Sequence, residues 1–235
     1  MNDISRLYLH VGTHKTGTTS IQTFMEDRVS LFAEAGVIPL LTPDGKANQY
    51  SLAHRFIRPE VRTPMRLRQA RPVSESAVQD KMLDHVRKSI GDSRYSSFLL
   101  SSEAFSFLRV DRERRELEAA VLKLVDEVLP ILVMREERAW RKSFGGQIRK
   151  MGIQAQCAEL EEAERPDGVW YYDREALCEF WGRVGPLITI DYDAALRRDG
   201  DVMPSFLTAV GIDSARYSER AIWKNLTRDP GYPPN

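Results

Sequence analysis

The feature that most constrains the fold is a short apolar run, residues 5–12, which leads through a glycine-bounded turn into a helix-like stretch at 17–35. The run SRLYLHVG is typical of a buried strand. The stretch that follows repeats apolar side chains at helical spacing, namely Ile21, Phe24, Met25, Val29 and Phe32. A strand, a tight turn and a helix in this order open a βαβ unit, in which successive strands run parallel.

The same alternation continues along the chain. Further strands are expected at 36–41, 96–102, 130–134 and 186–192, and helical stretches at 75–90, 112–127, 136–151, 155–164 and 173–182. The charged segment 46–74 is expected to be irregular, with one helical turn at 52–56. The pattern predicts one three-layer α/β/α domain with a central parallel sheet over 1–226, followed by a proline-rich tail at 227–235.

Composition narrows the classes of partner. Lys plus Arg and Asp plus Glu both number 34, so the net charge is zero and a general nucleic-acid or anionic-membrane binder is disfavoured. No apolar run approaches the roughly 20 residues of a membrane span, and the first residues lack the pattern of a signal peptide. Cys157 and Cys178 lack the spacing of a metal site. We therefore expect a soluble cytoplasmic protein with reduced thiols and no metal.

The turn after the first expected strand carries the chemical signal. It reads GTHKTGTT over 12–19, where glycines permit a tight turn and the following helix offers unpaired N–H groups to an anion. In nucleoside-triphosphate loops a lysine follows the second glycine, whereas here Thr18 occupies that position and Lys15 lies inside the loop. Such a loop suits a single 5′-phosphosulfate better than a γ-phosphate with its Mg²⁺.

With these residues the chain resembles the sulfotransferases that use 3′-phosphoadenosine 5′-phosphosulfate (PAPS), whose loop has the form K-x-G-T-[ST]. The bacterial members, with the string G-x-x-K-T-G-T-T-S-[IL]-Q, are the most similar, and residues 12–22 match it. The resemblance implies a P-loop-type fold and a donor loop made of His14, Lys15, Thr16, Gly17, Thr18 and Thr19. It also implies PAPS as donor, adenosine 3′,5′-bisphosphate as product and no metal; an ordinary glycine-rich turn is the alternative.

A second match lies after the expected strand at 130–134. Arg135 ends it and Ser143 follows in the next helix, at the spacing with which the family holds the 3′-phosphate of the donor. An arginine presents a planar fork of donors to a phosphate, and a hydroxyl two helical turns along can reach a second oxygen. A surface arginine and a solvated serine are the alternative reading of the same residues.

The resemblance also implies catalytic roles. Lys15 is expected to stabilise the charge that grows on the leaving 5′-phosphate. Glu103 ends the expected strand at 96–102, where many cytosolic sulfotransferases of animals have a catalytic histidine, and it is the first candidate base. Glu103 could equally cap the next helix or bind an arginine. His54 is the second candidate base, against the alternative of a surface histidine.

Two departures from the family pattern stand out. Bacterial relatives have histidines slightly before His54, where this chain has Asn48 and Gln49. The R-K-G string with which eukaryotic members close over the nucleotide is absent near Trp223, Lys224 and Asn225.

These observations predict a PAPS-dependent sulfotransferase acting on a hydroxyl or amine of a carbohydrate, lipid or small molecule. A Mg²⁺-dependent P-loop kinase or NTPase, or a catalytically silent nucleotide-binding module, are the alternatives. Acceptor specificity is expected to come from 46–74 and from 152–175, and the sequence indicates neither the acceptor nor the oligomeric state.

Overall fold

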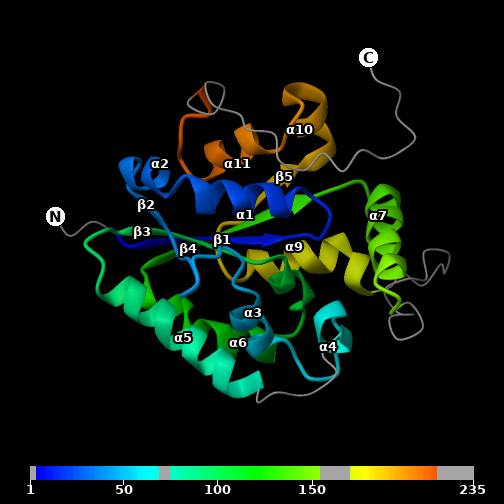
Figure 1. The fold of residues 1–235 in the computed structure, drawn as a ribbon, viewed down its shortest axis with the longest axis horizontal. Helices are drawn as coiled ribbons and strands as arrows, with labels where there is room; N and C mark the ends of the chain where they lie inside the picture. Colours follow the sequence, from blue (N-terminus) through cyan, green and yellow to red (C-terminus); the bar gives the residue numbers. More distant parts are fainter. Residues whose placement is uncertain (1–3, 69–74, 154–169, 216–235) are drawn as a thin grey trace.

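A computed structural model describes residues 4–68, 75–153 and 170–215 (Figure 1). Five strands form one all-parallel sheet in the order β2-β3-β1-β4-β5. The strands are β1 (Arg6–Gly12), β2 (Val37–Pro39), β3 (Ser97–Ser101), β4 (Glu127–Met134) and β5 (Ile188–Asp191). The predicted α/β architecture with a central parallel sheet is confirmed.

Helices cover both faces of the sheet, as Figure 1 shows. On one face lie α1 (Thr18–Asp27), α2 (Val29–Glu34), α10 (Tyr192–Asp199) and α11 (Met203–Ala209). On the other lie α3 (Tyr50–Phe56), α5 (Glu75–Gly91), α6 (Asp111–Ala120) and α9 (Arg174–Gly182). The helices α4 (Pro64–Arg68) and α7 (Glu137–Lys150) lie towards the edge of the sheet formed by the carboxyl ends of the strands. Three short 3₁₀ helices in the described residues are η1 (Glu103–Phe107), η2 (Leu122–Leu124) and η4 (Trp170–Tyr172).

Each face has its own apolar core, as expected for a sheet that is buried on both sides. On the α1 face, Met25, Phe32 and Phe206 are buried against side chains of the strands. On the α5 face, Trp140 and Trp181 join a larger and more aromatic core. The helices are therefore fixed by apolar burial, and the ends of the strands are free to carry polar groups.

The single helix expected over 17–35 is two helices. The chain turns at Arg28, whose φ of −127° lies outside the helical range, so α1 ends and α2 begins there. The bend brings the rings of Phe24 and Phe32 to a centroid distance of 6.0 Å. Apolar packing against the sheet thus overrides the continuous helical pattern.

The helix expected over 112–127 ends early. It stops at Ala120, and β4 begins at Glu127 rather than at 130. Hydrogen bonds between Ser5 and Asp126 pin this earlier start beside β1. Pro130 is accommodated inside β4 because β5 pairs with β4 only from Ile131 onward.

Other expectations differ from the structure or fall outside the described residues. The segment 46–74 contains two helices, α3 and α4, instead of one helical turn, and the sequence pattern did not predict α10 and α11. The stretch 155–164, the tail from 227, Cys157 and residues 223–225 lie outside the described residues. Within the described ranges, no helix is both long and apolar enough to cross a membrane.

Candidate functional site

The loop between β1 and α1 has a strained, closely tethered backbone. Gly12 and Gly17 have φ values of 77°, and Lys15, with φ 67°, is the one described non-glycine residue with positive φ. The amide of Thr13 donates to the carbonyl of Val133 at 2.8 Å, and the Thr16 hydroxyl donates to the carbonyl of Thr13 at 2.5 Å. A left-handed lysine costs about 1–3 kcal/mol and persists only where its surroundings hold it.

Both glycines are required by space as well as by φ. A Cβ on Gly12 would lie 2.8 Å from Cβ of Glu103, and one on Gly17 would lie 2.9 Å from a methyl group of Val202. Gly12 therefore lets the end of β1 lie directly against Glu103 at the end of β3. This close approach brings the expected donor loop and the first candidate base together.

The loop presents a mixture of exposed and buried groups. Lys15 and Thr19 are exposed, whereas Thr16 and Thr18 are buried. Gly17, the N-cap of α1, has no side chain to satisfy the first amides of that helix. Desolvation, and then repulsion from Lys150 and Arg135, lower the pKa of Lys15, so a bound anion at this point would be stabilised by several positive charges.

Arg135 directly follows β4, next to the loop. Its Nε lies 3.4 Å from Oδ1 of Asp193, and its guanidinium lies 5.4 Å from the ring centroid of Tyr192. Asp193 also accepts a hydrogen bond from the amide of Glu136 at 2.7 Å, which fixes the carboxylate. An arginine that is ion-paired on one side can present terminal nitrogens to a second acceptor such as a phosphate.

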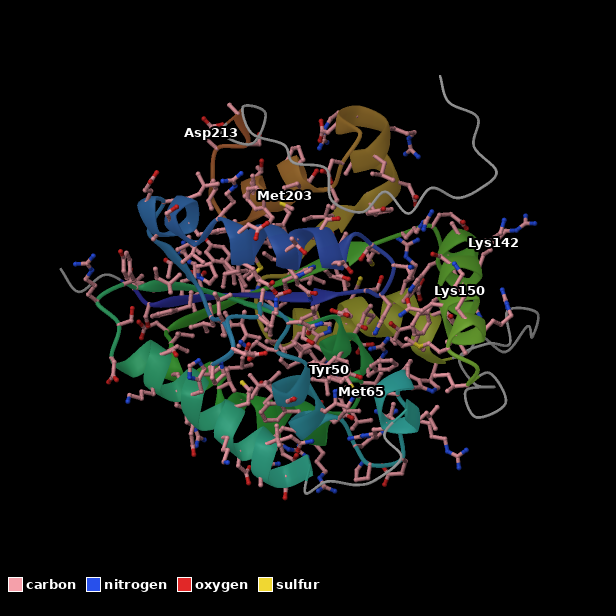
Figure 2. All side chains as sticks on the ribbon, viewed as in Figure 1. Tyr50, Met65, Lys142, Lys150, Met203 and Asp213 are labelled. Atoms are coloured by element: carbon pink, nitrogen blue, oxygen red, sulfur yellow. The ribbon has the colours of Figure 1, made fainter. Side chains whose placement is uncertain are left out.

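Ser143 lies half-buried on α7, the helix that Arg135 precedes. Figure 2 shows Lys142 and Lys150 on the same helix, at the end of the sheet where the strands finish. Lys150 is a residue that the sequence analysis did not select, and its electrostatic effect on Lys15 is the signal that identifies it.

Glu103 is half-buried and held by two amide side chains. Nε2 of Gln22 donates to one carboxylate oxygen at 2.8 Å, and Nδ2 of Asn48 donates to the same oxygen at 3.2 Å. Ser102, and not Glu103, caps η1, since its hydroxyl accepts from the amide of Ala104. Glu103 is therefore oriented by residues from α1 and from the loop before α3, and neither Gln22 nor Asn48 was among the expected site residues.

His54 is buried inside the α3–α4 region. Its Nδ1 donates to the carbonyl of Tyr50 at 3.0 Å, and its Nε2 accepts from the hydroxyl of Thr63 at 2.8 Å. Desolvation lowers its pKa to about 4. Both ring nitrogens of His54 are therefore engaged, and the side chain links α3 to Thr63, the residue before α4.

His14 is buried beneath the loop, among aromatic rings. Its ring lies within 5.2 Å of Phe107 and 4.7 Å of Phe144 between centroids, and its Nδ1 is 2.5 Å from the hydroxyl of Tyr171. Desolvation lowers its pKa to about 4, so the imidazole is neutral at pH 7. His14 thus shapes the loop from inside.

Within the described ranges no group of three or more His, Cys, Asp or Glu side chains is arranged to hold a metal ion. Cys178, the cysteine inside those ranges, is a free thiol beside the sulfur of Met134.

Comparison with known proteins finds similarity at the level of structure. No family model and no curated protein matches the sequence. The chain is similar to the crystal structure of a sulfotransferase from Alicyclobacillus acidocaldarius, with a TM-score of 0.51 and 16% identity over 88% of this chain and 81% of that one. This likeness shows the shared fold.

Two sulfotransferase domains also match, each with a TM-score of 0.48. One comes from the Synechococcus PCC 7002 olefin synthase, at 14% identity over 91% of this chain and 75% of that one. The other comes from the curacin biosynthetic pathway, at 12% identity over 89% of this chain and 74% of that one.

Proposed function

We propose that this chain transfers a sulfuryl group from PAPS to a hydroxyl or amine of a small-molecule, lipid or carbohydrate acceptor. The observation that carries the proposal is the convergence of three groups at the carboxyl end of the sheet. The Lys15 loop follows β1, Arg135 follows β4, and Glu103 follows β3 in contact with Gly12. The sulfotransferase fold neighbour supports the same reading.

On the donor side, the exposed loop and α7 fit an anion with two phosphate-like ends. Thr18, Thr19 and the first amides of α1 bind the 5′-phosphosulfate, with Lys15 against the bridging oxygen. Arg135 and Ser143 bind the 3′-phosphate. Desolvation, and then repulsion from Lys150 and Arg135, lower the pKa of Lys15, and these two neighbouring charges favour a dianion at this position.

The donor, when bound, supplies a sulfuryl group on a phosphate leaving group. Glu103 accepts the proton of the acceptor hydroxyl or amine as the acceptor atom bonds to sulfur. The bond between sulfur and the 5′-phosphate oxygen breaks in the same step, and Lys15 stabilises the charge that develops on that oxygen. The proton on Glu103 is returned to water after adenosine 3′,5′-bisphosphate leaves.

Gln22 and Asn48 support this role of Glu103. Both side chains donate hydrogen bonds to the carboxylate, which fixes its direction. Asn48 stands where bacterial relatives have a histidine, and here it orients the base instead of serving as one.

The test is a transfer assay with ³⁵S-labelled PAPS and a panel of sugars, hydroxylated lipids, phenols and amines. Labelled product that disappears with Glu103→Gln and Lys15→Ala supports the proposal. A wild-type protein that binds no PAPS, or binds Mg²⁺·ATP in its place, contradicts it and favours a kinase or NTPase.

A further inference from the structure

Three hydroxyl and imidazole groups form a buried chain behind the expected donor loop. His14 Nδ1 lies 2.5 Å from the hydroxyl of Tyr171, which lies 3.1 Å from the hydroxyl of Ser106. The Ser106 hydroxyl donates to the backbone carbonyl of Glu103 at 2.6 Å. The chain thus joins the residue before Lys15 to the backbone of the candidate base.

The positions of the protons in this series of hydrogen bonds follow from its last acceptor, the backbone carbonyl of Glu103. A backbone carbonyl can only accept, so the proton of Ser106 is committed to Glu103. Tyr171 must then donate its own proton to Ser106, because two oxygens at hydrogen-bond distance need one proton between them. The phenol oxygen is left to accept, and His14 must donate to it from Nδ1.

The surroundings leave Tyr171 no freedom to change partners. Its ring stacks on Phe107 at a centroid distance of 4.7 Å and lies 5.2 Å from the ring of Trp140. The guanidinium of Arg109 donates to the carbonyl of Tyr171 at 3.0 Å and to the carbonyl of Ser106 at 2.5 Å. Arg109 therefore fixes the backbones of both Ser106 and Tyr171, so that their hydroxyl groups meet in one geometry.

Resting on the proposed function, we infer that Tyr171 and Ser106 are positioning residues that hold His14 in its Nδ1–H tautomer and thereby fix the Lys15 loop for the donor. His14 and Lys15 are adjacent, and Lys15 carries the strained φ of 67°. A loop in that conformation needs a rigid neighbour on at least one side. The buried Tyr171 hydroxyl, which makes hydrogen bonds to both His14 and Ser106, provides this rigid neighbour. Residues that hydrogen-bond to metal-binding histidines orient those histidines in the same way.

The tautomer is read directly by nuclear magnetic resonance of the full chain labelled with ¹⁵N-histidine, with the His14 signals identified as those lost in His14→Gln. The wild type is expected to show a protonated Nδ1 and a bare Nε2. In Ser106→Ala the Tyr171 proton loses its acceptor and turns to Nδ1, so the proton of His14 is expected to move to Nε2. A wild-type His14 protonated at Nε2, or a Ser106→Ala spectrum unchanged from wild type, overturns the inference.

Two tyrosine variants provide the matched comparison. Tyr171→Phe is expected to raise the Nε2–H fraction of His14 and to weaken binding of adenosine 3′,5′-bisphosphate about tenfold. Tyr8→Phe removes the hydroxyl of a buried tyrosine that packs in the core on the other face of the sheet, and should change neither. Equal effects of the two variants on the tautomer contradict the inference. If the wild type shows the expected tautomer but binds no bisphosphate, the proposed function fails while the hydrogen-bonded chain stands.

Discussion

The donor side and the acceptor side of the candidate site are built differently. On the donor side, Lys15 and Thr19 are exposed on a loop that is shaped by its glycines and by the buried His14. On the acceptor side, Glu103 is cross-linked to side chains from α1 and from the loop before α3. A substitution on the donor side should therefore change function with little cost in stability, whereas one on the acceptor side should change both.

Lys15→Ala gives the largest expected effect. Removing the ammonium that stabilises the leaving oxygen should lower the rate of sulfuryl transfer by about 10²–10³-fold. The melting temperature should stay within about 1 °C of wild type, because the side chain is exposed. Transfer rates and thermal unfolding measure this, with Lys88→Ala on exposed α5 surface as control; a large loss of stability would contradict the donor half of the comparison.

Glu103→Gln should lower the transfer rate by about 10²-fold while donor binding is kept. The neutral amide of glutamine cannot take a proton. The melting temperature should also fall, because the side-chain amides of Gln22 and Asn48 donate to a carboxylate at this position. Pre-steady-state rates, bisphosphate binding and thermal unfolding separate these effects. Full activity with Gln at 103 would rule out Glu103 as the base.

Arg135→Ala should weaken binding of adenosine 3′,5′-bisphosphate by about 2 kcal/mol, or roughly 30-fold, while leaving the affinity for 5′-AMP nearly unchanged. The expected reason is loss of the contact with the 3′-phosphate alone. Arg138→Ala, an exposed arginine one turn along, is the control. Equal losses for both nucleotides would place Arg135 away from the 3′-phosphate.

Gly12→Ala tests the contact between the two sides. At φ 77°, and with a Cβ 2.8 Å from that of Glu103, the substitution should destabilise the fold by about 1–3 kcal/mol and lower activity. Gly45→Ala has a similar φ of 78° but nothing within 4 Å of the new Cβ, so it isolates the backbone strain from the clash. Equal denaturant midpoints for the two variants would contradict the close approach.

The smallest expected effect concerns pH. His10, His14 and His54 are buried, and desolvation lowers the pKa of each from 6.5 to about 4. The unfolded chain then binds protons more readily, so stability is complete above pH 6.5 and falls as the pH drops towards 4. Each histidine contributes a slope of at most about 1.4 kcal/mol per pH unit.

His54→Gln should therefore reduce the slope of unfolding free energy against pH below pH 6.5 by the contribution of one histidine. The transfer rate at pH 7 should stay within about twofold of wild type. Urea unfolding between pH 4 and 7 measures the first effect. A transfer rate that falls as far as in Glu103→Gln would favour a catalytic role for His54.

The sequence predicted the parallel sheet, and it allowed donor-side candidates to be selected, because both depend on local patterns. A buried strand, a glycine-bounded turn and a helix are contiguous, and Arg135 and Ser143 share one strand end and helix. The acceptor side depends on contacts between residues far apart in the chain. Gln22 and Glu103 are 81 residues apart, so their contact cannot be predicted from local spacing. The same holds for the 157 residues that separate His14, in the donor loop, from Tyr171.

Where local pattern and packing compete, packing decides. The helical pattern at 17–35 continues through Arg28, yet the chain bends there so that Phe24 and Phe32 both meet the core. His54, for which a surface position was one interpretation, is buried in α3 with both ring nitrogens hydrogen-bonded. The burial of His54 and its hydrogen bonds to Tyr50 and Thr63 could not be predicted from local spacing.

The most direct test of the account is calorimetric titration of the wild-type chain with adenosine 3′,5′-bisphosphate, 5′-AMP and ATP, each with and without Mg²⁺. The account predicts metal-independent binding of the bisphosphate, with 5′-AMP weaker by about the contribution of one phosphate–arginine contact, roughly 2 kcal/mol. Equal binding of the bisphosphate and 5′-AMP, or tightest binding of ATP in the presence of Mg²⁺, would contradict it.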